Sequence, residues 1–134
     1  MKADILKGLK NWEYTNITIP KKFNKNKALV KITICGICST DVVRSMKTGF
    51  YSYPIVPGHE MIGQIEKIKK NKSFKKGDRV AVYPLIPCKK CVYCKQNNQN
   101  LCNNYDFLGS RSNGGYAEYV ITPINNLIKI PKKV

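Results

Sequence analysis

Short stretches with the polarity pattern of β-strands recur along most of the chain. In some of them apolar and polar residues alternate, as in half-buried strands, and in others apolar residues predominate. They cover residues 28–34, 61–68, 80–86, 115–122 and 127–130. Gly63 interrupts the isoleucines of the second stretch, and glycine-containing turn signals precede the third and the fourth. Several short strands at irregular spacing predict a mainly β domain with a barrel-like sheet.

Two intervals depart from this strand pattern. Residues 39–46 predict one short helix, with Ser39 or Thr40 near its N-cap. Residues 87–105 show no strand pattern and hold four of the six cysteines. The sequence therefore predicts β-strands together with one polar, cysteine-rich segment.

The length and the apolar content suit one soluble domain. The 134 residues are 43% hydrophobic, and no apolar run approaches the roughly 20 residues that a membrane span needs. The first ten residues alternate lysine with apolar residues and have no signal-peptide core. We therefore expect a cytoplasmic protein with no membrane partner, in which the cysteines are reduced thiols or metal ligands rather than disulfides.

The net charge of +16 suggests an affinity for nucleic acid. The composition argues against this, because 21 lysines accompany only three arginines, and arginine is the residue best suited to bidentate recognition of bases and phosphates. The lysines are also spread along the whole chain. We expect a solvated basic surface and no nucleic-acid partner, while attraction of a small anionic substrate stays open. A zinc-binding basic module for nucleic acid is the alternative from a different functional class.

Four cysteines of the polar segment have the spacing of a metal site. Cys88, Cys91, Cys94 and Cys102 follow a C-x2-C-x2-C-x7-C pattern. Four thiolates can surround one ion tetrahedrally, zinc prefers this ligand set, and its binding would supply the folding free energy of so polar a loop. Bacterial iron–sulfur runs begin alike but continue with three residues and then Cys-Pro, whereas here seven residues intervene and Asn103 follows. The spacing favours a closed, structural zinc site over an iron–sulfur cluster.

A second set of candidate ligands precedes this segment. His59, the only histidine, is followed by Glu60, and Cys38 opens the predicted helix that contains Thr40 and Asp41. Thiolate, imidazole and carboxylate together suit an open zinc site, which keeps one position for water or substrate. Asp41 is suited to hold the second imidazole nitrogen, and the Thr40 hydroxyl is suited to pass on a proton. Both residues also have a purely structural interpretation at the start of a helix.

Cys35 and Cys38 form a C-x2-C pair, which permits a zinc ribbon or a redox pair. Ile32 and Ile34 lie beside Cys35 in the predicted strand. We therefore expect Cys35 to be a small buried residue rather than a ligand.

The order of these motifs resembles that of the zinc-dependent medium-chain alcohol and polyol dehydrogenases. The resemblance covers roughly residues 28–130 and is specific because the motifs occur as an ordered set. The motifs are Gly36-Ile37-Cys38-Ser39-Thr40-Asp41, Gly58-His59-Glu60, Gly77-Asp78-Arg79-Val80, the four-cysteine segment and Gly114-Gly115-Tyr116-Ala117-Glu118-Tyr119. Within that family the sequence is most similar to the sorbitol and galactitol-1-phosphate types. This likeness is carried by Tyr53-Pro54-Ile55, Pro84-Leu85-Ile86-Pro87-Cys88 and Tyr105-Asp106-Phe107-Leu108-Gly109-Ser110-Arg111.

The resemblance implies a GroES-like β-barrel for residues 1–134, with a zinc lobe at about 87–105. It places a catalytic zinc on Cys38 and His59, with Glu60 able to bind it directly, and a structural zinc on the four cysteines of the lobe. Thr40 falls where the family has its proton-relay hydroxyl. The implied reaction is the reversible oxidation of a secondary alcohol in a sugar alcohol or its phosphate.

The resemblance also implies a cofactor that this sequence has no motif for. The family binds NAD(P) on a Rossmann domain, whose glycine-rich turn does not occur in the 134 residues. We therefore expect the chain to end before the cofactor domain and to be inactive alone. The full-length parent is expected to be a homo-oligomer that acts on a small-molecule polyol or polyol phosphate.

Overall fold

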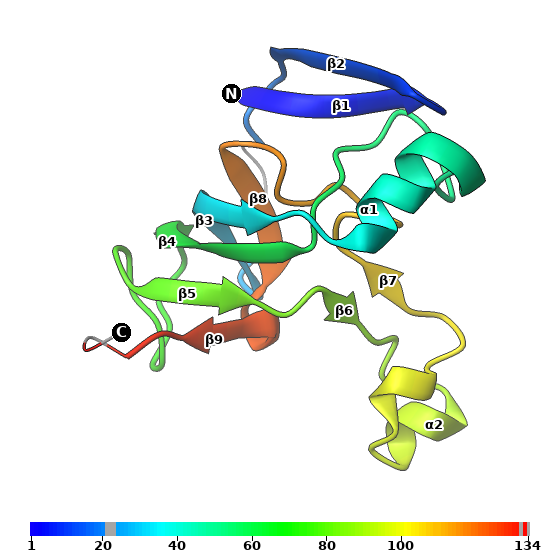
Figure 1. Ribbon diagram of the computed structural model, residues 1–134. Coiled ribbons are helices and arrows are strands. Elements are labelled where there is room, and N and C mark those ends of the chain that lie inside the picture. The colour runs from blue at the N-terminus through cyan, green and yellow to red at the C-terminus, as the bar shows by residue number, and fades with distance from the viewer. Residues whose placement is uncertain (21–23, 132, 134) are drawn as a thin grey trace.

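Strands make up most of the regular structure, which confirms the mainly β fold class. The computed structural model describes residues 1–20, 24–131 and 133, and Figure 1 shows their arrangement. The strands are β1 (Lys2–Gly8), β2 (Asn11–Asn16), β3 (Lys27–Gly36), β4 (Glu60–Ile68), β5 (Arg79–Val82), β6 (Leu85–Ile86), β7 (Asp106–Phe107), β8 (Tyr119–Pro123) and β9 (Leu127–Lys129). The helical segments are α1 (Ser39–Val43), a π-helical turn (Arg44–Thr48), α2 (Val92–Lys95) and 3-10 turns at Gln99–Leu101 and Ile124–Asn126. None of the described helices is long and apolar enough to cross a membrane.

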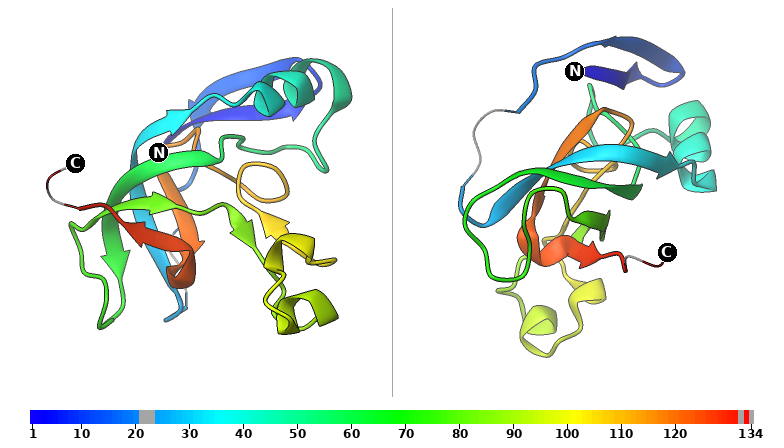
Figure 2. Two further views of the ribbon diagram at one scale, coloured as in Figure 1. Left: turned by 60° about the horizontal axis from the view of Figure 1, so that its bottom comes forward. Right: turned by 90° about the vertical axis from the view of Figure 1, so that its left-hand side faces the viewer.

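A five-stranded antiparallel sheet, in the order β8-β3-β4-β5-β9, forms the centre of the fold. Figure 2 shows how strongly this sheet twists. Apolar residues on one of its faces form the core, among them Val30, Ile65, Val80 and Val120. Burial on this face stabilises the sheet, because each fully buried aliphatic side chain contributes about 1.5–3 kcal/mol.

The opposite face of the sheet carries an exposed apolar row. Ile34 pairs with Ile62, and Ile62 pairs in turn with Ala81. Ala81 pairs with Ile128 on the edge strand β9. The three isoleucines are 62%, 39% and 56% exposed in chain order, so the apolar positions of these strands do not all belong to the core.

Gly63 is required by the close approach of β3 and β4. The register of these two strands shifts between Ile32 and Ile34, as at a β-bulge. A Cβ atom at the buried Gly63 would lie 2.1 Å from the carbonyl oxygen of Lys31, so no larger residue fits without movement of the backbone. The glycine that interrupts the isoleucine pattern therefore has a steric cause.

Three predicted boundaries differ from the observed ones. The run 80–86 is two strands, because the proline after Tyr83 lacks the N–H that a strand ladder needs. The stretch 115–122 becomes a strand only at Tyr119. The helix begins at Ser39, as predicted, with Cys38 as its N-cap, and it continues beyond Val43 as a π-helical turn that ends at Thr48 rather than at residue 46.

An N-terminal hairpin of β1 and β2 was not among the predicted strands. Leu6 is fully buried and exchanges backbone hydrogen bonds with Ile55, at N···O distances of 2.8 and 3.0 Å. The hairpin thereby holds the segment that leads to His59. The alternation of lysine with apolar residues was its sequence signal, and the partner on which it packs is 49 positions further along the chain, as the Leu6–Ile55 pairing shows.

Residues 88–102, all of which the structure describes, form a lobe outside the core. Strands β6 and β7 pair with each other and form its stem. Figures 1 and 2 show that the lobe projects away from the central sheet. Its regular elements are the single-turn helix α2 and the turn Gln99–Leu101, so its stability requires a source other than an extensive apolar core.

Replacement of the buried Asn126 by alanine is expected to destabilise the junction of β5 and β6. The Asn126 side-chain amide donates to the carbonyl oxygens of Tyr83 and Leu85, both at 2.7 Å. An unpaired buried polar group costs about 1–3 kcal/mol, and chemical unfolding followed by circular dichroism measures the loss. The exposed neighbour Asn125 supplies the control Asn125→Ala, and equal stability of the two variants would contradict the prediction.

Candidate functional site

The loop before β4 is shaped to present His59. Gly58 has a φ of 89°, and a Cβ atom there would lie 2.5 Å from the ring of Tyr116. The Gly115 N–H donates to the Gly58 carbonyl oxygen at 2.8 Å, and the Tyr116 N–H donates to that of Pro57 at 3.0 Å. Residues almost 60 positions apart thus set the backbone that carries His59.

Cys38 lies where β3 gives way to α1. Its N–H donates to Asp41 Oδ2 at 3.2 Å, which fixes the first turn of the helix. The Thr40 hydroxyl donates to Cys38 Sγ, also at 3.2 Å, so the hydroxyl and the thiol lie together. Ligand atoms of Cys38, His59 and Glu60 lie within 4.8 Å of one another, close enough to share one ion.

Glu60 enters this group because Gly36 leaves room for it. The two residues are paired across β3 and β4. A Cβ atom on Gly36 would lie 2.3 Å from Glu60 Oε2, so any other residue would displace the carboxylate. The glycine next to the Cys38 segment therefore admits the third donor.

Asp41 connects the parts of the site. It is only 3% exposed, and its Oδ1 lies 3.3 Å from His59 Nδ1, the contact expected from the sequence. The Tyr116 hydroxyl lies 3.1 Å from Asp41 Oδ2 and 3.2 Å from the Gly36 carbonyl oxygen, and its single hydrogen is shared between these two acceptors. Burial, and then the nearby Asp41 charge, raise the pKa of Tyr116, so its hydroxyl remains a donor.

Tyr116 was not singled out as a functional residue in the sequence. It belongs to the Gly-Gly-Tyr-Ala-Glu-Tyr motif, which was the available signal. Its role depends on a contact between residues 75 positions apart, which local spacing does not reveal.

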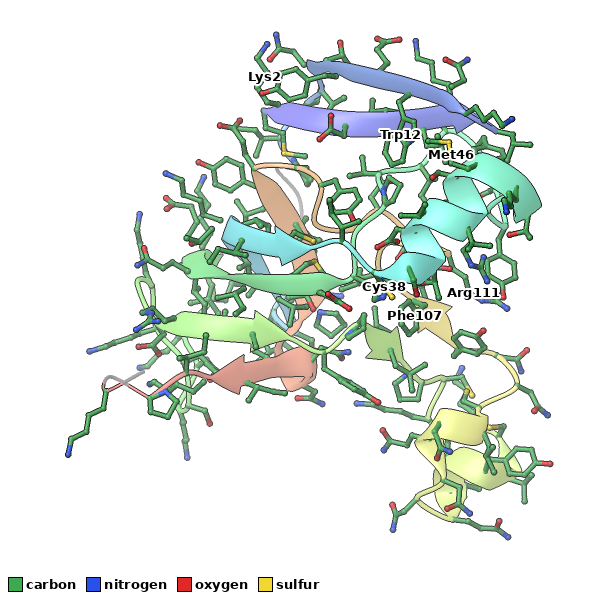
Figure 3. The ribbon with its side chains drawn as sticks, viewed as in Figure 1. Lys2, Trp12, Cys38, Met46, Phe107 and Arg111 are labelled. Atoms are coloured by element: carbon green, nitrogen blue, oxygen red, sulfur yellow. The ribbon has the colours of Figure 1, made fainter. Side chains whose placement is uncertain are left out.

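A pocket of about 300 Å³ opens beside the Cys38 and His59 side chains. The ring centroids of Phe107 and His59 are 5.7 Å apart in an edge-on arrangement, which places an apolar wall next to the imidazole. Figure 3 labels Cys38, Phe107 and Arg111 on the side of the molecule below α1. In the sequence, residues 105–111 stood out only through their likeness to polyol dehydrogenases, and in the structure three of them line this pocket. The pocket is lined by Cys38, Thr40, Asp41, Arg44, Phe50, Tyr51, His59, Tyr105, Phe107 and Ser110.

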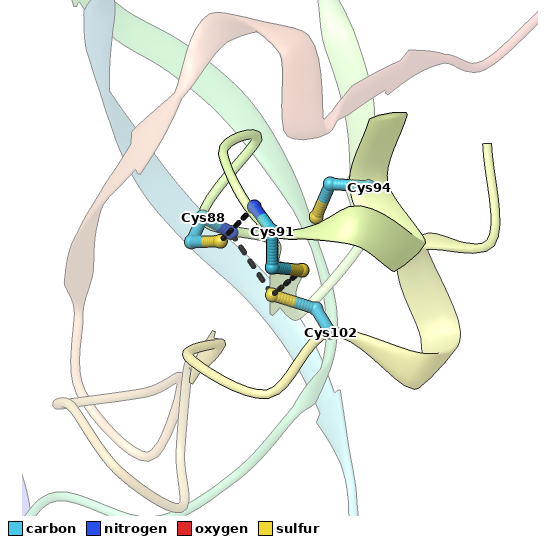
Figure 4. A group of neighbouring side chains, drawn as sticks. All are labelled: Cys88, Cys91, Cys94 and Cys102. Carbon is cyan, nitrogen blue, oxygen red and sulfur yellow. Dashed lines mark hydrogen bonds between the residues drawn. The ribbon is translucent and has the colours of Figure 1, made fainter. Parts of the chain in front are cut away.

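The four cysteines of the lobe converge as their spacing predicted. Sulfur atoms of Cys88, Cys91, Cys94 and Cys102 lie within 4.8 Å of one another, and Figure 4 shows them facing a common centre. The Sγ atoms of Cys91 and Cys102 are 3.9 Å apart. A tetrahedral zinc with Zn–S bonds of about 2.3 Å separates its sulfurs by about 3.8 Å, so the donors fit that ion.

Backbone N–H groups also point at these sulfurs. Cys88 Sγ accepts from the N–H groups of Lys90 and Cys91, both at 3.4 Å, and Cys102 Sγ accepts from the Cys88 N–H at 3.2 Å. The tight turn that permits this includes Lys89 with a φ of 59°. Such donors favour the thiolate form, which is the form that binds metal.

Two cysteines of the lobe differ in acidity. A hydrogen bond from the Cys94 backbone lowers the pKa of Cys91 to about 6, which favours its thiolate form. Burial raises the pKa of Cys94 to about 12. A metal ion bound here would displace the Cys94 proton, which couples binding to pH.

Cys35 stays outside both ligand groups. It is half-buried and packs against the core. Burial raises the pKa of its thiol to about 11, which keeps it protonated. Its small size matters, because Cβ atoms at Gly58 and Gly115 would lie within 3 Å of its sulfur.

Comparison with known proteins identifies relatives of this chain. The sequence profile of the alcohol dehydrogenase GroES-like domain matches residues 24–132. Galactitol 1-phosphate 5-dehydrogenase from Escherichia coli (strain K12) is 38% identical over 114 residues, which are 84% of this chain and 33% of that protein. The chain therefore spans about a third of the length of this curated relative.

Solved structures agree with this comparison. The crystal structure of galactitol-1-phosphate dehydrogenase from Escherichia coli has a TM-score of 0.93 and 34% identity, over 98% of this chain and 38% of that one. A zinc-binding dehydrogenase from Sinorhizobium meliloti 1021 bound to NADP has a TM-score of 0.91 and 31% identity, over 99% and 39% of the respective chains. The GroES-like architecture expected from the sequence is thereby confirmed.

Metal content tests the two ligand groups separately. Purified without chelator, the chain is expected to hold two zinc ions, and Cys94→Ser is expected to lose the tighter one because only three of four lobe ligands remain. Elemental analysis measures this, and limited proteolysis reports loosening of the lobe. Cys35→Ala removes a thiol outside both groups and should keep both ions. Iron with visible absorbance, or full zinc in Cys94→Ser, would refute the lobe assignment.

Removal of the Tyr116 hydroxyl tests whether this group helps Asp41 to orient His59. Tyr116→Phe is expected to lower zinc affinity at Cys38, His59 and Glu60 by about 10–100-fold, because groups that orient metal ligands typically have effects of this size. Competition with a chromophoric chelator measures it once the lobe is filled. Tyr14 is 67% exposed on β2, so Tyr14→Phe is the matched control. Unchanged affinity in Tyr116→Phe would show that Asp41 holds His59 without the tyrosine.

Proposed function

The chain belongs to the alcohol dehydrogenase GroES-like domain family, and we propose that it is the zinc-binding catalytic part of an NAD(P)-dependent polyol dehydrogenase. One observation carries the proposal: Cys38, His59 and Glu60 offer ligand atoms within 4.8 Å of one another, beside a pocket that the Thr40 hydroxyl also lines. The similarity to galactitol 1-phosphate 5-dehydrogenase supports oxidation of a secondary alcohol in a sugar alcohol or its phosphate.

The two ligand groups suit different roles. Four thiols in the lobe complete a tetrahedral shell, as in structural zinc sites. Cys38, His59 and Glu60 supply three donors and leave a position for substrate. Zinc bound there would act as a Lewis acid on the substrate hydroxyl.

The protein side chains position and deprotonate the substrate. The Thr40 hydroxyl lies beside the Cys38 sulfur and accepts the proton of the substrate alcohol, which it passes towards solvent. Asp41 holds Nδ1 of His59 and thereby leaves Nε2 for the metal. Phe107 shields the imidazole on one side and limits access of water.

Residues 1–134 are proposed to act as one GroES-like domain, with its zinc lobe at about 87–105. The described residues contain no glycine-rich strand-turn-helix unit for a dinucleotide, whereas a relative of similar fold binds NADP. The hydride acceptor would then bind to polypeptide outside these residues, in a cytoplasmic homo-oligomer. A basic zinc module for nucleic acid would have no use for the Cys38–His59–Glu60 group and its Asp41 support.

A chimera tests this function. In it the chain replaces the matched segment of the Escherichia coli galactitol-1-phosphate dehydrogenase, which its fold fits over 98% of its length. The chimera is expected to reduce NAD(P) with polyols, and Thr40→Val to lower kcat by about 10²–10⁴-fold, because loss of a general acid–base group has that effect. Thr40→Ser keeps the hydroxyl and should retain most of the rate.

Two results would contradict the proposal. One is a chimera that binds zinc and NADH but oxidises no alcohol. The other is a preference for ethanol over sorbitol and galactitol 1-phosphate of about tenfold or more in kcat/KM, which corresponds to about 1.4 kcal/mol. In addition, residues 1–134 alone are expected not to bind NADH at micromolar concentration, since their described part offers no helix N-terminus of a dinucleotide fold.

A further inference from the structure

Two of the three arginines meet at one tyrosine beside the pocket. Arg44 lies in the π-helical turn after α1, and Arg111 lies in the loop after β7. Their guanidinium carbons are 4.8 and 4.0 Å from the ring centroid of Tyr51. Segments some 65 positions apart therefore bring two positive charges onto one aromatic ring, in a chain whose other cations are almost all lysines.

Further aromatic rings hold the two guanidinium groups in place. Arg111 lies 4.3 Å from the centroid of Tyr105, and Arg44 lies 5.8 Å from that of Phe50. Arg44, Tyr51 and Tyr105 line the same pocket as Cys38 and His59. Arg44 thus belongs to the wall of the candidate catalytic pocket, and the exposed Arg111, labelled in Figure 3, adjoins that wall through its contacts with Tyr51 and Tyr105.

The charge of this cluster is not balanced by carboxylates. No ion pair joins either arginine to Asp or Glu within the part of the chain that the structure describes. Asp41 is the one carboxylate among the described pocket-lining residues, and it is buried and already engaged by His59 and Tyr116. Two neighbouring guanidinium groups without a counter-charge attract an anion, and their planar forks match phosphate and carboxylate oxygens.

The acidity of Tyr51 agrees with a positive potential at this place. Its hydrogen bonds with Tyr105 and then Arg44 lower the pKa of Tyr51 to about 8. The part of this shift that comes from Arg44 and Arg111 reflects their attraction for negative charge, which also favours a bound anion. The pocket volume of about 300 Å³ is at the lower end of ligand pockets and suits a small substrate.

We propose that Arg44 and Arg111, spaced by Tyr51 and Tyr105, bind the anionic group of the substrate whose hydroxyl lies at Cys38, His59 and Glu60. The anionic group is a phosphate or a carboxylate, so the substrate class is a charged polyol rather than a neutral one. This inference depends on the proposed function, because it assigns the second end of the same pocket.

Phosphate binding to the zinc-loaded chain tests the site without catalysis. Inorganic phosphate is titrated at fixed ionic strength by calorimetry and by ³¹P NMR. Arg44→Gln and Arg111→Gln are each expected to weaken binding by about tenfold or more, because a hydrogen bond to a charged group is lost. Arg79 is exposed on β5, which pairs with β4 and β9 rather than with the segments that carry Arg44 and Arg111. Arg79→Gln therefore removes the same charge elsewhere and should change affinity by less than about twofold.

Two further variants test whether phosphate binding requires the guanidinium geometry and whether the phosphate binds to zinc instead. Arg111→Lys keeps the charge but not the fork, and it should bind phosphate more weakly than the unchanged chain if the guanidinium geometry matters. Cys38→Ser removes a metal ligand, and phosphate affinity that persists in this variant places the anion at the arginines rather than on zinc. Equal loss in Arg79→Gln, or no loss in Arg44→Gln and Arg111→Gln, would overturn the proposal.

The chimera distinguishes whether the anionic group of the substrate is a phosphate or a carboxylate. Its kcat/KM is compared for galactitol 1-phosphate, galactonate and galactitol, with and without Arg111→Gln. A selective loss on the phosphate identifies a phosphate site, and a selective loss on galactonate identifies a carboxylate site. An equal effect on neutral galactitol overturns the anion assignment while the dehydrogenase proposal stands. Absence of zinc at Cys38, His59 and Glu60 with intact phosphate binding would instead refute the dehydrogenase proposal.

Discussion

The candidate site depends on the contacts that the buried Asp41 carboxylate makes. It accepts hydrogen bonds from the Cys38 N–H and the Tyr116 hydroxyl, and it contacts Nδ1 of His59. These partners come from the end of β3, the segment before β8 and the loop before β4. Because the carboxylate is shielded from water, each of these interactions is stronger than it would be at the surface. One side chain thus fixes the relative positions of two candidate metal ligands.

That arrangement is possible only because the backbone around it is crowded. A side chain at Gly36 would displace Glu60, and one at Gly58 would collide with Tyr116. The N-terminal hairpin adds support through the Leu6–Ile55 backbone pair. The ligands are therefore held by a packed frame, while the lobe lacks such a frame and depends on its own four sulfurs. The two ligand groups thus differ both in their donor atoms and in what holds them in place.

Among the many positive charges, we assign a binding role to one described pair, Arg44 and Arg111. Most lysines are spread along the chain, as on a solvated surface. Arg44 and Arg111 are different, because Arg44 lines the pocket and aromatic rings hold both guanidinium groups, two of these rings being the pocket-lining Tyr51 and Tyr105. Flexible lysines steer anions from a distance, whereas stacked guanidinium groups can bind one in a fixed orientation. The amino-acid composition therefore did not indicate which cations are placed to bind an anion beside the pocket.

The sequence by itself determined the mainly β class, the identity of the candidate ligands and their grouping in two sets. These features depend on residue type and on spacing over a few positions: alternation predicts strands, and the C-x2-C-x2-C run closes on itself within one short segment. The contacts of Cys38 with Thr40 and with Asp41 are equally local, because a single helical turn contains all three residues.

Only the tertiary structure decided which residues from different strands and loops come into contact. Tyr116 reaches Asp41 over 75 positions, and Arg111 reaches Tyr51 over 60. The bulge in β3 and the close approach at Gly63 determine which isoleucines face the core, and Ile34 is left exposed. Such contacts depend on strand order and register, and a shift of one residue reverses the faces of a strand without changing its local pattern. Local sequence therefore specified the candidate ligands, and long-range packing specified the pocket beside Cys38 and His59.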